Sequence, residues 1–357
     1  MPVSDSDITL VFQGPVIHGP LGTADCIRMT RRALPHSRCV LSTWTGSNTS
    51  GLAVDHVVLS DDPGWLPGIK SRDGVGQPNN VNRQILSARE GLRKIGTEYA
   101  VKIRTDCALK DGALVTAARR FWDIGIERRI LTSSLFTVDP LMFEQMPYHI
   151  SDWFQFGSAS TLQQYWSVPF MTEADARFYD DRPHAAHSTF LDRRFRSRLA
   201  VEQHLATHYA RQLGYSVPRY HNDIAQDVME GHRSFLARHC LILDPWDVGL
   251  EFPKYEWAYR SDFQRLNCLL FCDWYELYRE AGGSPVEMSP APLAAQRRRR
   301  KQVARLLGRW FDKAGPLLSS TRLKQVVNRL LAVLASHPDR PPSRRGIDPH
   351  RPSKVHR

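Results

Sequence analysis

The chain has 357 residues, 42% of them hydrophobic, and a formal net charge of +11 at pH 7. This length is sufficient to bury an enzyme-sized core, either in one large domain with an appendage or in two modest domains. The sequence shows neither a charged-then-apolar signal peptide nor an apolar run of about eighteen residues that could span a bilayer. These features argue against a bilayer-spanning protein and predict a cytoplasmic body.

The excess of positive charge lies in the carboxyl-terminal part. Of the 48 Lys and Arg and the 37 Asp and Glu, 17 and 3 respectively follow residue 289, which leaves 31 and 34 for residues 1–289. A nearly neutral body of this kind does not predict nucleic-acid binding. The six cysteines include no Cys-x-x-Cys pair, so we expect reduced, mostly buried thiols rather than a zinc site or a disulfide framework.

Strands and helices are predicted to alternate in the first part of the chain. Strands are expected at residues 8–12, 39–44 and 56–59, and a helix at 23–34 follows the first of them. This order predicts an α/β fold in which a mostly parallel sheet is flanked by helices.

Polar residues follow each of these strands. Gln13 and Gly14 follow the first strand, Trp44 ends the second, and Asp61 follows the third. Ligands of such sheets bind outside the carboxyl ends of the strands, where an aromatic ring beside hydroxyls and acids suits a nucleobase and a ribose. The alternative is that these residues serve only as turn residues.

A helix is predicted to start at Asn79 or Asn80, either of which can cap it, and to run to about Ile95. Its buried stripe is expected to consist of Val81, Ile85, Ala88 and Leu92. Arg83 then lies in the first turn, where free backbone N–H groups favour an anion. Arg83 could therefore bind a phosphate group, and Asn80 is a further candidate binding residue. The alternative for Arg83 is a solvated helix charge.

The strand that begins at Tyr99 is expected to be central to the protein. Its apolar residues alternate with smaller or charged ones, which is typical of a strand, and it ends at Arg104-Thr-Asp106. At the carboxyl edge of a sheet, Asp106 could hold a Mg²⁺ or Mn²⁺ ion that bridges two phosphates. The alternative is an Asp106 that caps the next turn or pairs with Arg104.

A second group of candidate residues lies in the aromatic segment 148–157. His149, Asp152 and Trp153 are close together there, and the aromatic residues of the segment should anchor it in the core. A rigidly held acid beside an indole is typical of a sugar-binding or general-base site. The alternative is a capping Asp among core aromatics.

The rest of the body is predicted to contain helices at 111–123, 199–213 and near 263–278, and a strand at 129–137. Glu202, on the second of these helices, is the other acid that we consider for base catalysis. His221, Asn222 and Asp223 are expected in a surface loop, with closure over the site as the alternative.

The sequence predicts four regions. A catalytic domain at 1–281 is followed by a linker at 282–296, which is rich in Gly, Ser and Pro. Residues 297–336 are expected to form basic amphipathic helices that bind an anionic membrane surface, with about 1 kcal/mol for each basic residue near it. The alternative for this region is a self-packing or disordered extension, and we expect disorder at 337–357.

Six motifs together resemble a known family. They are Phe12-Gln-Gly-Pro-Val16, Leu41-Ser-Thr-Trp-Thr-Gly46, Asn79-Asn-Val-Asn-Arg-Gln84, Lys102-Ile-Arg-Thr-Asp106, Ser134-Leu-Phe-Thr137 and His149-Ile-Ser-Asp-Trp-Phe154. In this order and at these separations, over about residues 8–255, the series resembles the WavE lipopolysaccharide synthesis family. The resemblance implies a bacterial surface-polysaccharide enzyme, a glycosyltransferase with the GT-A-like (Rossmann-type) sheet that binds nucleotide sugars.

The chain departs from the usual metal motif of that fold at one position. The motif is Asp-x-Asp, whereas Arg104 stands here in place of the first acid. If Arg104 lies at the diphosphate, its guanidinium can neutralise charge bidentately and take over part of the metal's role. The requirement for Mg²⁺ or Mn²⁺ is therefore an open question.

The sequence and the resemblance together predict a nucleotide-sugar donor and a lipid-linked or oligosaccharide acceptor. They allow a peripheral location of the enzyme on the inner face of the plasma membrane. Asp152 is the first candidate for the base and Glu202 the second, while His149 and Trp153 are expected to bind the donor sugar. Two alternatives stay open. One is a non-catalytic scaffold subunit of a polysaccharide assembly complex, and the other is a nucleotidyl- or phosphotransferase on a similar sheet.

Overall fold

The computed structural model describes residues 3–69, 78–142, 144–189, 192–253 and 267–286, together with 302, 303 and 306. All of them belong to one compact unit, Met1–Pro316, and the second unit, Leu317–Arg357, contains no described residue. The terminal segment expected to be disordered lies outside the described residues, as do nearly all of the predicted basic helices and most of the linker. Within the described part, no helix is both long and apolar enough to cross a bilayer.

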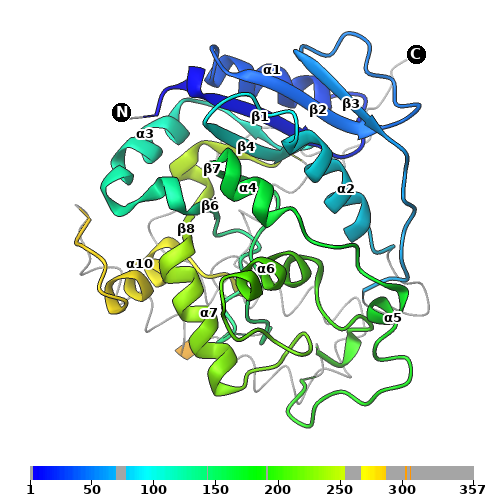
Figure 1. Cartoon of the computed structure of the whole chain (residues 1–357), viewed down its shortest axis with the longest axis vertical. Helices are drawn as coiled ribbons and strands as arrows, with labels where there is room; N and C mark the ends of the chain where they lie inside the picture. Colours follow the sequence, from blue (N-terminus) through cyan, green and yellow to red (C-terminus); the bar gives the residue numbers. More distant parts are fainter. Residues whose placement is uncertain are drawn as a thin grey trace, which may run out of the picture. The chain divides into compact units, whose positions relative to one another are not determined.

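A seven-stranded sheet with the order β3-β2-β1-β4-β7-β6-β8 forms the centre of this unit (Figure 1). Its strands are β1 (Ile8–Gln13), β2 (Arg38–Trp44), β3 (His56–Ser60), β4 (Tyr99–Arg104), β6 (Ile130–Ser133), β7 (Phe154–Ser158) and β8 (Cys240–Leu243). Only β7, between β4 and β6, runs antiparallel to its neighbours. A separate antiparallel pair joins β5 (Ala108–Leu109) to β9 (Leu250–Glu251). In the chain, β5 follows β4 and β9 follows β8.

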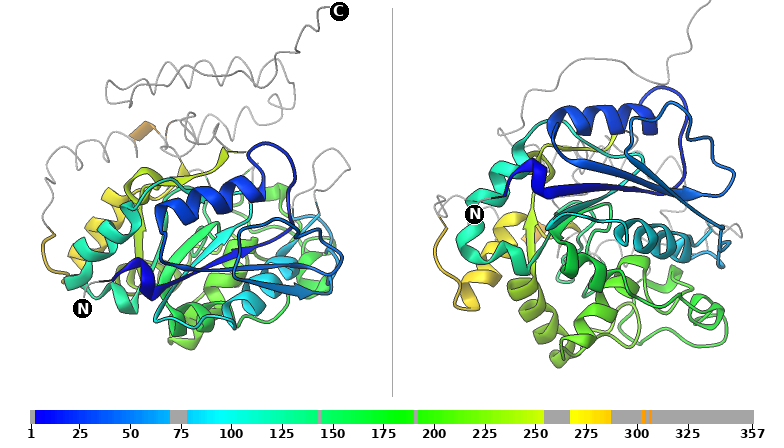
Figure 2. Two further views of the ribbon diagram at one scale, coloured as in Figure 1. Left: turned by 90° about the horizontal axis from the view of Figure 1, so that it is seen from above. Right: turned by 45° about the horizontal axis from the view of Figure 1, so that its top comes forward.

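Helices cover both faces of the sheet. They are α1 (Thr23–Ala33), α2 (Val81–Leu92), α3 (Ala113–Arg120), α4 (Ala159–Tyr165), α5 (Glu173–Ala176), α6 (Val201–Gln212), α7 (Gln226–His239) and α10 (Phe271–Glu280). Short 3₁₀ helices are η1 (Asp5–Asp7), η2 (Trp122–Ile124), η3 (Ile126–Arg128), η4 (Asp192–Arg194) and η5 (Pro245–Val248). Figure 2 shows α1 on one face of the sheet and α2 and α4 on the other. The expected α/β fold, a mostly parallel sheet flanked by helices, is confirmed.

Helix α2 forms because its apolar residues recur at helical spacing. The four residues of the predicted stripe are completely buried. Burial of each of the three larger side chains, Val81, Ile85 and Leu92, stabilises the fold by roughly 1.5–3 kcal/mol relative to an exposed one. Asn79 rather than Asn80 caps the helix with its side chain, since the Val81 N–H donates to Asn79 Oδ1 at 3.0 Å. The helix is thereby fixed against β1 and β2.

Gly91 sets how closely α2 packs on the sheet. A Cβ atom at this position would lie 2.6 Å from Val11 Cγ1 and 2.9 Å from Ser42 Cβ. We expect Gly91→Ala to lower the free energy of unfolding by about 1–2 kcal/mol, because overpacking at about 1–3 kcal/mol exceeds the roughly 1 kcal/mol gained in helix propensity.

Urea denaturation of Gly91→Ala and Gly96→Ala checks this expectation. A Cβ at Gly96 meets only the Arg38 guanidinium, on an exposed side chain that can move away. Equal midpoints for the two variants would contradict the close packing of α2.

Several elements differ from the sequence-based expectation, and four of the differences are as follows. β7 is an antiparallel strand within the aromatic segment, and α7 was not predicted. The helix expected at 111–123 ends at Arg120 and continues into η2. The strand expected at 129–137 ends at Ser133 because the chain turns there: the Thr137 N–H donates to the Ser134 carbonyl at 3.0 Å, and φ of Phe136 is +64°.

The prediction of a surface loop at His221, Asn222 and Asp223 is wrong, since these residues are 0%, 0% and 1% exposed. Gln203 on α6 donates to the His221 carbonyl at 2.7 Å, and Arg219 donates to Asp223 Oδ2 at 2.7 Å. The Gln203 amide from α6 and the exposed Arg219 thus hold this buried segment in place.

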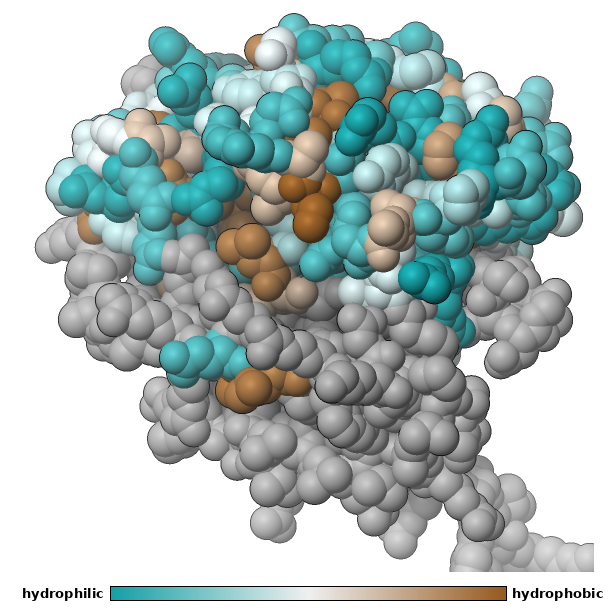
Figure 3. All heavy atoms as spheres, turned by 90° about the horizontal axis from the view of Figure 1, so that it is seen from below, coloured by the Kyte–Doolittle hydropathy of each residue, from teal (hydrophilic) through white to brown (hydrophobic). Residues whose placement is uncertain are grey.

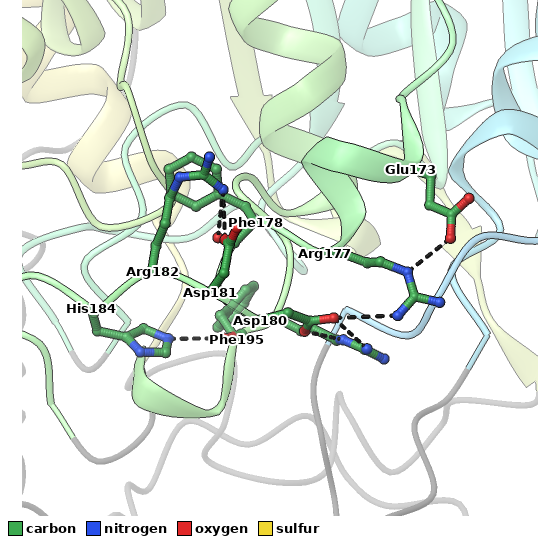
Figure 4. A network of polar contacts seen from close by, with 9 residues as sticks. Glu173, Arg177, Phe178, Asp180, Asp181, Arg182, His184 and Phe195 are labelled. Atoms are coloured by element: carbon green, nitrogen blue, oxygen red, sulfur yellow. Dashed lines mark hydrogen bonds and ion pairs between the residues drawn. The ribbon is translucent and has the colours of Figure 1, made fainter.

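A loop-rich segment around α5, residues 169–198, is held by exposed ion pairs. Arg177 lies between Glu173 and Asp180, and Arg196 donates to both oxygens of Asp180 at 2.5 and 2.6 Å (Figure 4). The Arg196 N–H also donates to the Ile69 carbonyl at 2.7 Å. Among the coloured residues in Figure 3, hydrophilic side chains predominate and hydrophobic ones gather near the centre of the view. Each exposed pair contributes at most about 1 kcal/mol.

Candidate active site

The turn after β1 lies directly against the end of β4. The two strands pair in parallel with Gln13 opposite Arg104. Beyond that pair, the Thr105 N–H donates to the Gln13 carbonyl at 3.1 Å, and Thr105 Oγ1 donates to the Pro15 carbonyl at 2.7 Å. Gly14 has φ of +121° and approaches Thr105 so closely that a Cβ would lie 3.3 Å from Oγ1. Asp106 therefore emerges beside this turn, at the carboxyl edge of the sheet.

Arg104 and Asp106 form a bidentate ion pair at that edge. Arg104 donates from Nε to Oδ1 at 2.9 Å and from Nη2 to Oδ2 at 2.7 Å. The two side chains are 21% and 6% exposed. Burial acts to lower the pKa of Arg104, but the adjacent Asp106 carboxylate outweighs it and the pKa is raised. The guanidinium also lies over the Trp153 ring, 4.6 Å from its centre. A fixed positive charge thus stays at the end of β4.

The side chains around Asp106 do not form a ready-made site for the expected Mg²⁺ or Mn²⁺ ion. Both carboxylate oxygens of Asp106 accept hydrogen bonds from Arg104. Among the residues that the structure describes, no group of three or more His, Cys, Asp or Glu could hold a metal ion. A cation would have to share an Asp106 oxygen with Arg104, with phosphates among its remaining ligands. Metal binding stays a prediction, and the mechanism proposed below includes no step through a metal.

Asp152 lies in the interior, immediately before β7. It is 1% exposed, and its Oδ2 has no hydrogen-bond partner among the described residues. Lys102 of β4, which is completely buried, donates from Nζ to the Asp152 backbone carbonyl. Burying a carboxylate without hydrogen bonds is costly, and such groups are characteristic of functional sites.

Trp153 connects Asp152 to the Arg104–Asp106 pair. Its ring stacks on Phe136, with centres 4.4 Å apart and planes at 30°, and meets Phe252 edge-on at 4.9 Å. The Trp153 backbone carbonyl accepts a hydrogen bond from the Arg104 N–H at 3.1 Å. The indole is therefore held rigidly, as was expected for a residue beside a candidate base.

Glu202 and His149 form a second pair of titratable side chains at the same edge of the sheet. His149 Nε2 lies 3.3 Å from Glu202 Oε2, and His149 Nδ1 is 3.0 Å from the Phe136 carbonyl. Burial raises the pKa of Glu202, His149 lowers it, and the negative charge of Asp152 raises it further, so that the net direction is upward. Glu202 and Asp152 thus influence each other electrostatically, as the two acids of a single site do.

Arg83 lies in the first turn of α2, and the structure pairs it with an acid after β3. It donates to both oxygens of Asp62 at 2.7 and 2.5 Å and to Asn80 Oδ1 at 2.9 Å. The Arg83 hydrogen bonds lower the pKa of Asp62. Trp65, which is 66% exposed, has the Arg83 guanidinium 5.5 Å from its ring centre. Neither expectation for Arg83 foresaw this ion pair.

The remaining predicted residues hold the edge together. Asp61 accepts from Thr45 Oγ1 at 3.0 Å, close to the half-buried Trp44 at the end of β2. The Gln13 side chain is buried and its Oε1 accepts from Ser87 of α2 at 3.1 Å. The amide of Gln13 is therefore a structural link between β1 and α2.

Sequence reasoning missed three side chains that these contacts bring in, namely Lys102, Phe136 and Trp65. Lys102 and Phe136 lie within two of the six motifs described above. Their position in these motifs could have indicated that they belong to the site. Trp65 follows the turn at Asp61 and Asp62 and had no such signal.

The fold and this cluster define a class of protein: an α/β protein whose charged and aromatic side chains converge at the carboxyl edge of a mostly parallel sheet. Residues 8–307 match the family model described as WavE lipopolysaccharide synthesis. The chain belongs to the WavE lipopolysaccharide synthesis family. A search of curated proteins finds no match.

Two solved structures are similar to parts of the chain. One is the crystal structure of S. aureus TarS, with 10% identity and a TM-score of 0.29 over 46% of this chain and 30% of that chain. The other is S. aureus TarS 1–349, with 10% identity and a TM-score of 0.27 over 43% of this chain and 47% of that chain. The match spans less than half of either TarS chain.

Proposed function

We propose that this protein is a glycosyltransferase that moves a sugar from a nucleoside diphosphate donor to a hydroxyl of a lipopolysaccharide-core or other cell-surface polysaccharide acceptor. The observation that carries the proposal is the convergence of two unlike groups at one sheet edge. A partly buried guanidinium at Arg104 lies over the Trp153 ring, beside the turn after β1. The buried Asp152 directly precedes Trp153, and Glu202, with a 19% exposed side chain, lies against His149. Membership of the WavE family supports the polysaccharide pathway.

The two groups fit the two charge changes of such a reaction. As the bond between the anomeric carbon and the β-phosphate oxygen breaks, negative charge grows on the diphosphate, which the Arg104 guanidinium can bind with two parallel N–H donors. In an inverting reaction Asp152 takes the proton of the acceptor hydroxyl while that oxygen attacks the anomeric carbon. Glu202 with His149 is the second candidate for this base.

Calorimetry with UDP, GDP, ADP, CDP and dTDP, with and without Mn²⁺, tests the proposal. We expect the wild type to bind at least one of these nucleotides. Arg104→Ala should weaken that binding at least tenfold, because the guanidinium supplies a charge-assisted pair of hydrogen bonds. Arg93→Ala is the matched control, since Arg93 has a 62% exposed side chain at the end of α2 and pairs only with Glu90 among the described residues.

A second candidate is a non-catalytic scaffold subunit of a polysaccharide assembly complex. The observation that favours it is the closed Arg104–Asp106 pair, in which both oxygens of the acid are already occupied. In that case no nucleotide of the panel binds, with or without Mn²⁺. Release of phosphate or pyrophosphate without sugar transfer would instead indicate a phospho- or nucleotidyltransferase.

A further inference from the structure

Left-handed backbone conformations are concentrated around His149. Among the residues that the structure describes, three other than glycine have a positive φ, namely Leu21, Phe136 and Tyr148. Tyr148, with φ of +62°, directly precedes His149, and the carbonyl oxygen of Phe136, with φ of +64°, lies 3.0 Å from His149 Nδ1. A bulky aromatic residue rarely adopts this conformation, which costs free energy, and such residues cluster at functional sites.

The turn that follows β6 holds Phe136 in its conformation. The Thr137 N–H donates to the Ser134 carbonyl at 3.0 Å, and Thr137 Oγ1 donates to the Ser133 carbonyl at 2.7 Å. Because two hydrogen bonds close the turn immediately after Phe136, its carbonyl keeps its direction toward His149.

Tyr148 is fixed from α7. Its N–H donates to Nδ1 of His232 at 3.0 Å, and its hydroxyl donates to the Ser216 carbonyl at 2.8 Å. Burial lowers the pKa of His232 to about 3, so this imidazole stays neutral and its Nδ1 can accept the hydrogen bond. His149 is therefore held through the backbone that precedes it as well as through its own ring.

The bond to Phe136 also fixes which nitrogen of His149 carries a proton. A carbonyl oxygen only accepts hydrogen bonds, so His149 Nδ1 is the donor. His149 Nε2 then faces Glu202 Oε2 at 3.3 Å. The two side chains are 10% and 19% exposed, so the pair is not closed off from a ligand at this edge of the sheet.

The ring of Phe136 connects this pair to the other half of the site. It stacks on Trp153 with ring centres 4.4 Å apart, and the Arg104 guanidinium lies 4.6 Å from the centre of the Trp153 ring. One residue in a costly conformation thus contacts both the histidine beside the acid and the indole beside the cation.

We propose that Phe136 is a positioning residue, whose left-handed backbone directs its carbonyl to His149 and thereby holds the imidazole in one orientation against Glu202. This inference rests on the function proposed above, in which Glu202 with His149 is a candidate base. The strained backbone lowers the stability of the protein, and in return His149 is already oriented before a substrate binds. Such exchanges of stability for activity are common at active sites.

Phe136→Val and Phe136→Asn test this role, because both remove the ring but differ in backbone preference. Asparagine tolerates the left-handed conformation, whereas a β-branched residue almost never adopts it. The measurement is ¹⁵N NMR of the histidine rings, with His149→Gln to assign the His149 signals. We expect a proton on His149 Nδ1 in the wild type and in Phe136→Asn, and at least tenfold faster exchange of this proton with water in Phe136→Val.

Leu21→Val and Leu21→Asn are the matched controls, since Leu21 has φ of +57° and is 59% exposed in the loop before α1. Leu21→Val should have a lower urea midpoint than Leu21→Asn, while the His149 Nδ1 signal stays the same in both. Equal exchange rates in folded Phe136→Val and Phe136→Asn overturn the proposal. If Phe136→Val does not fold, Phe136→Ala takes its place with the same two outcomes, because alanine tolerates a positive φ less well than asparagine.

Sugar transfer separates a positioning role from a merely structural one. In the folded variants, kcat of Phe136→Val should be at least tenfold below that of Phe136→Asn, with nucleotide affinities equal within twofold. The two proposals fail separately, because the ring signals need no substrate. A chain that binds no nucleotide contradicts the proposed function, and a chain that transfers sugar with equal kcat in both variants contradicts the role of Phe136.

Discussion

Replacing Asp152 with Asn should lower kcat of sugar transfer by roughly 10²- to 10⁴-fold, the range in which a general base contributes. The amide has the size of the carboxyl group but does not accept the acceptor's proton. Asp152 Oδ2 makes no hydrogen bond within the described part of the chain, so the substitution breaks none there. Because the negative charge of Asp152 acts on the buried Lys102 ammonium, thermal unfolding of the variant is measured beside its kcat, and a loss of kcat in a fully folded sample is assigned to the chemical step.

Two further variants show whether Asp152 is the base. Glu202→Gln should lower kcat less than Asp152→Asn does, and the reverse order would assign the base to Glu202 with His149. Asp227→Asn, at an exposed acid in the first turn of α7, should leave kcat unchanged. A correctly folded Asp152→Asn that keeps full transferase activity removes Asp152 from the proposed role.

The position of Asp106 could be predicted from sequence because it follows from local pattern and one general rule. The alternation from Tyr99 onward indicated β4, and the carboxyl-edge rule for parallel strands placed Asp106 beside the turn at Gln13 and Gly14. The buried stripe of α2 followed in the same way from helical spacing. Each of these inferences needs only residues that are near in sequence.

The contacts within the site could not be predicted, because they join segments that are far apart in the chain. His149 meets Glu202 across 53 positions, and Lys102 reaches Asp152 across 50. No periodicity encodes such pairs; they depend on the antiparallel insertion of β7, which places Asp152 at the same edge as the end of β4. The sequence motifs indicated the residues of this cluster, whereas the contacts between them are seen only in the folded structure.

Arg104→Lys should be far from conservative at this site. Lysine keeps the charge but presents it as a point, so it loses the two parallel hydrogen bonds to Asp106 and the planar contact with Trp153. We expect kcat to fall by about 10²- to 10³-fold, the cost of removing one preorganised donor from a developing negative charge. The affinity for the nucleoside diphosphate should fall in the same variant.

The matched control is Arg93→Lys on α2, where the exposed Arg93 pairs with Glu90 and should tolerate the change.

Asp106→Asn, and the double variant that combines it with Arg104→Lys, complete a double-mutant cycle. Because Asp106 and Arg104 act as one unit, the double variant should lose much less than the product of the two single losses. Losses that multiply would mean that the two side chains serve separate ligands. If Arg104→Lys keeps the wild-type kcat and nucleotide affinity, the diphosphate binds elsewhere in the protein. The reaction would then also take place away from this edge of the sheet.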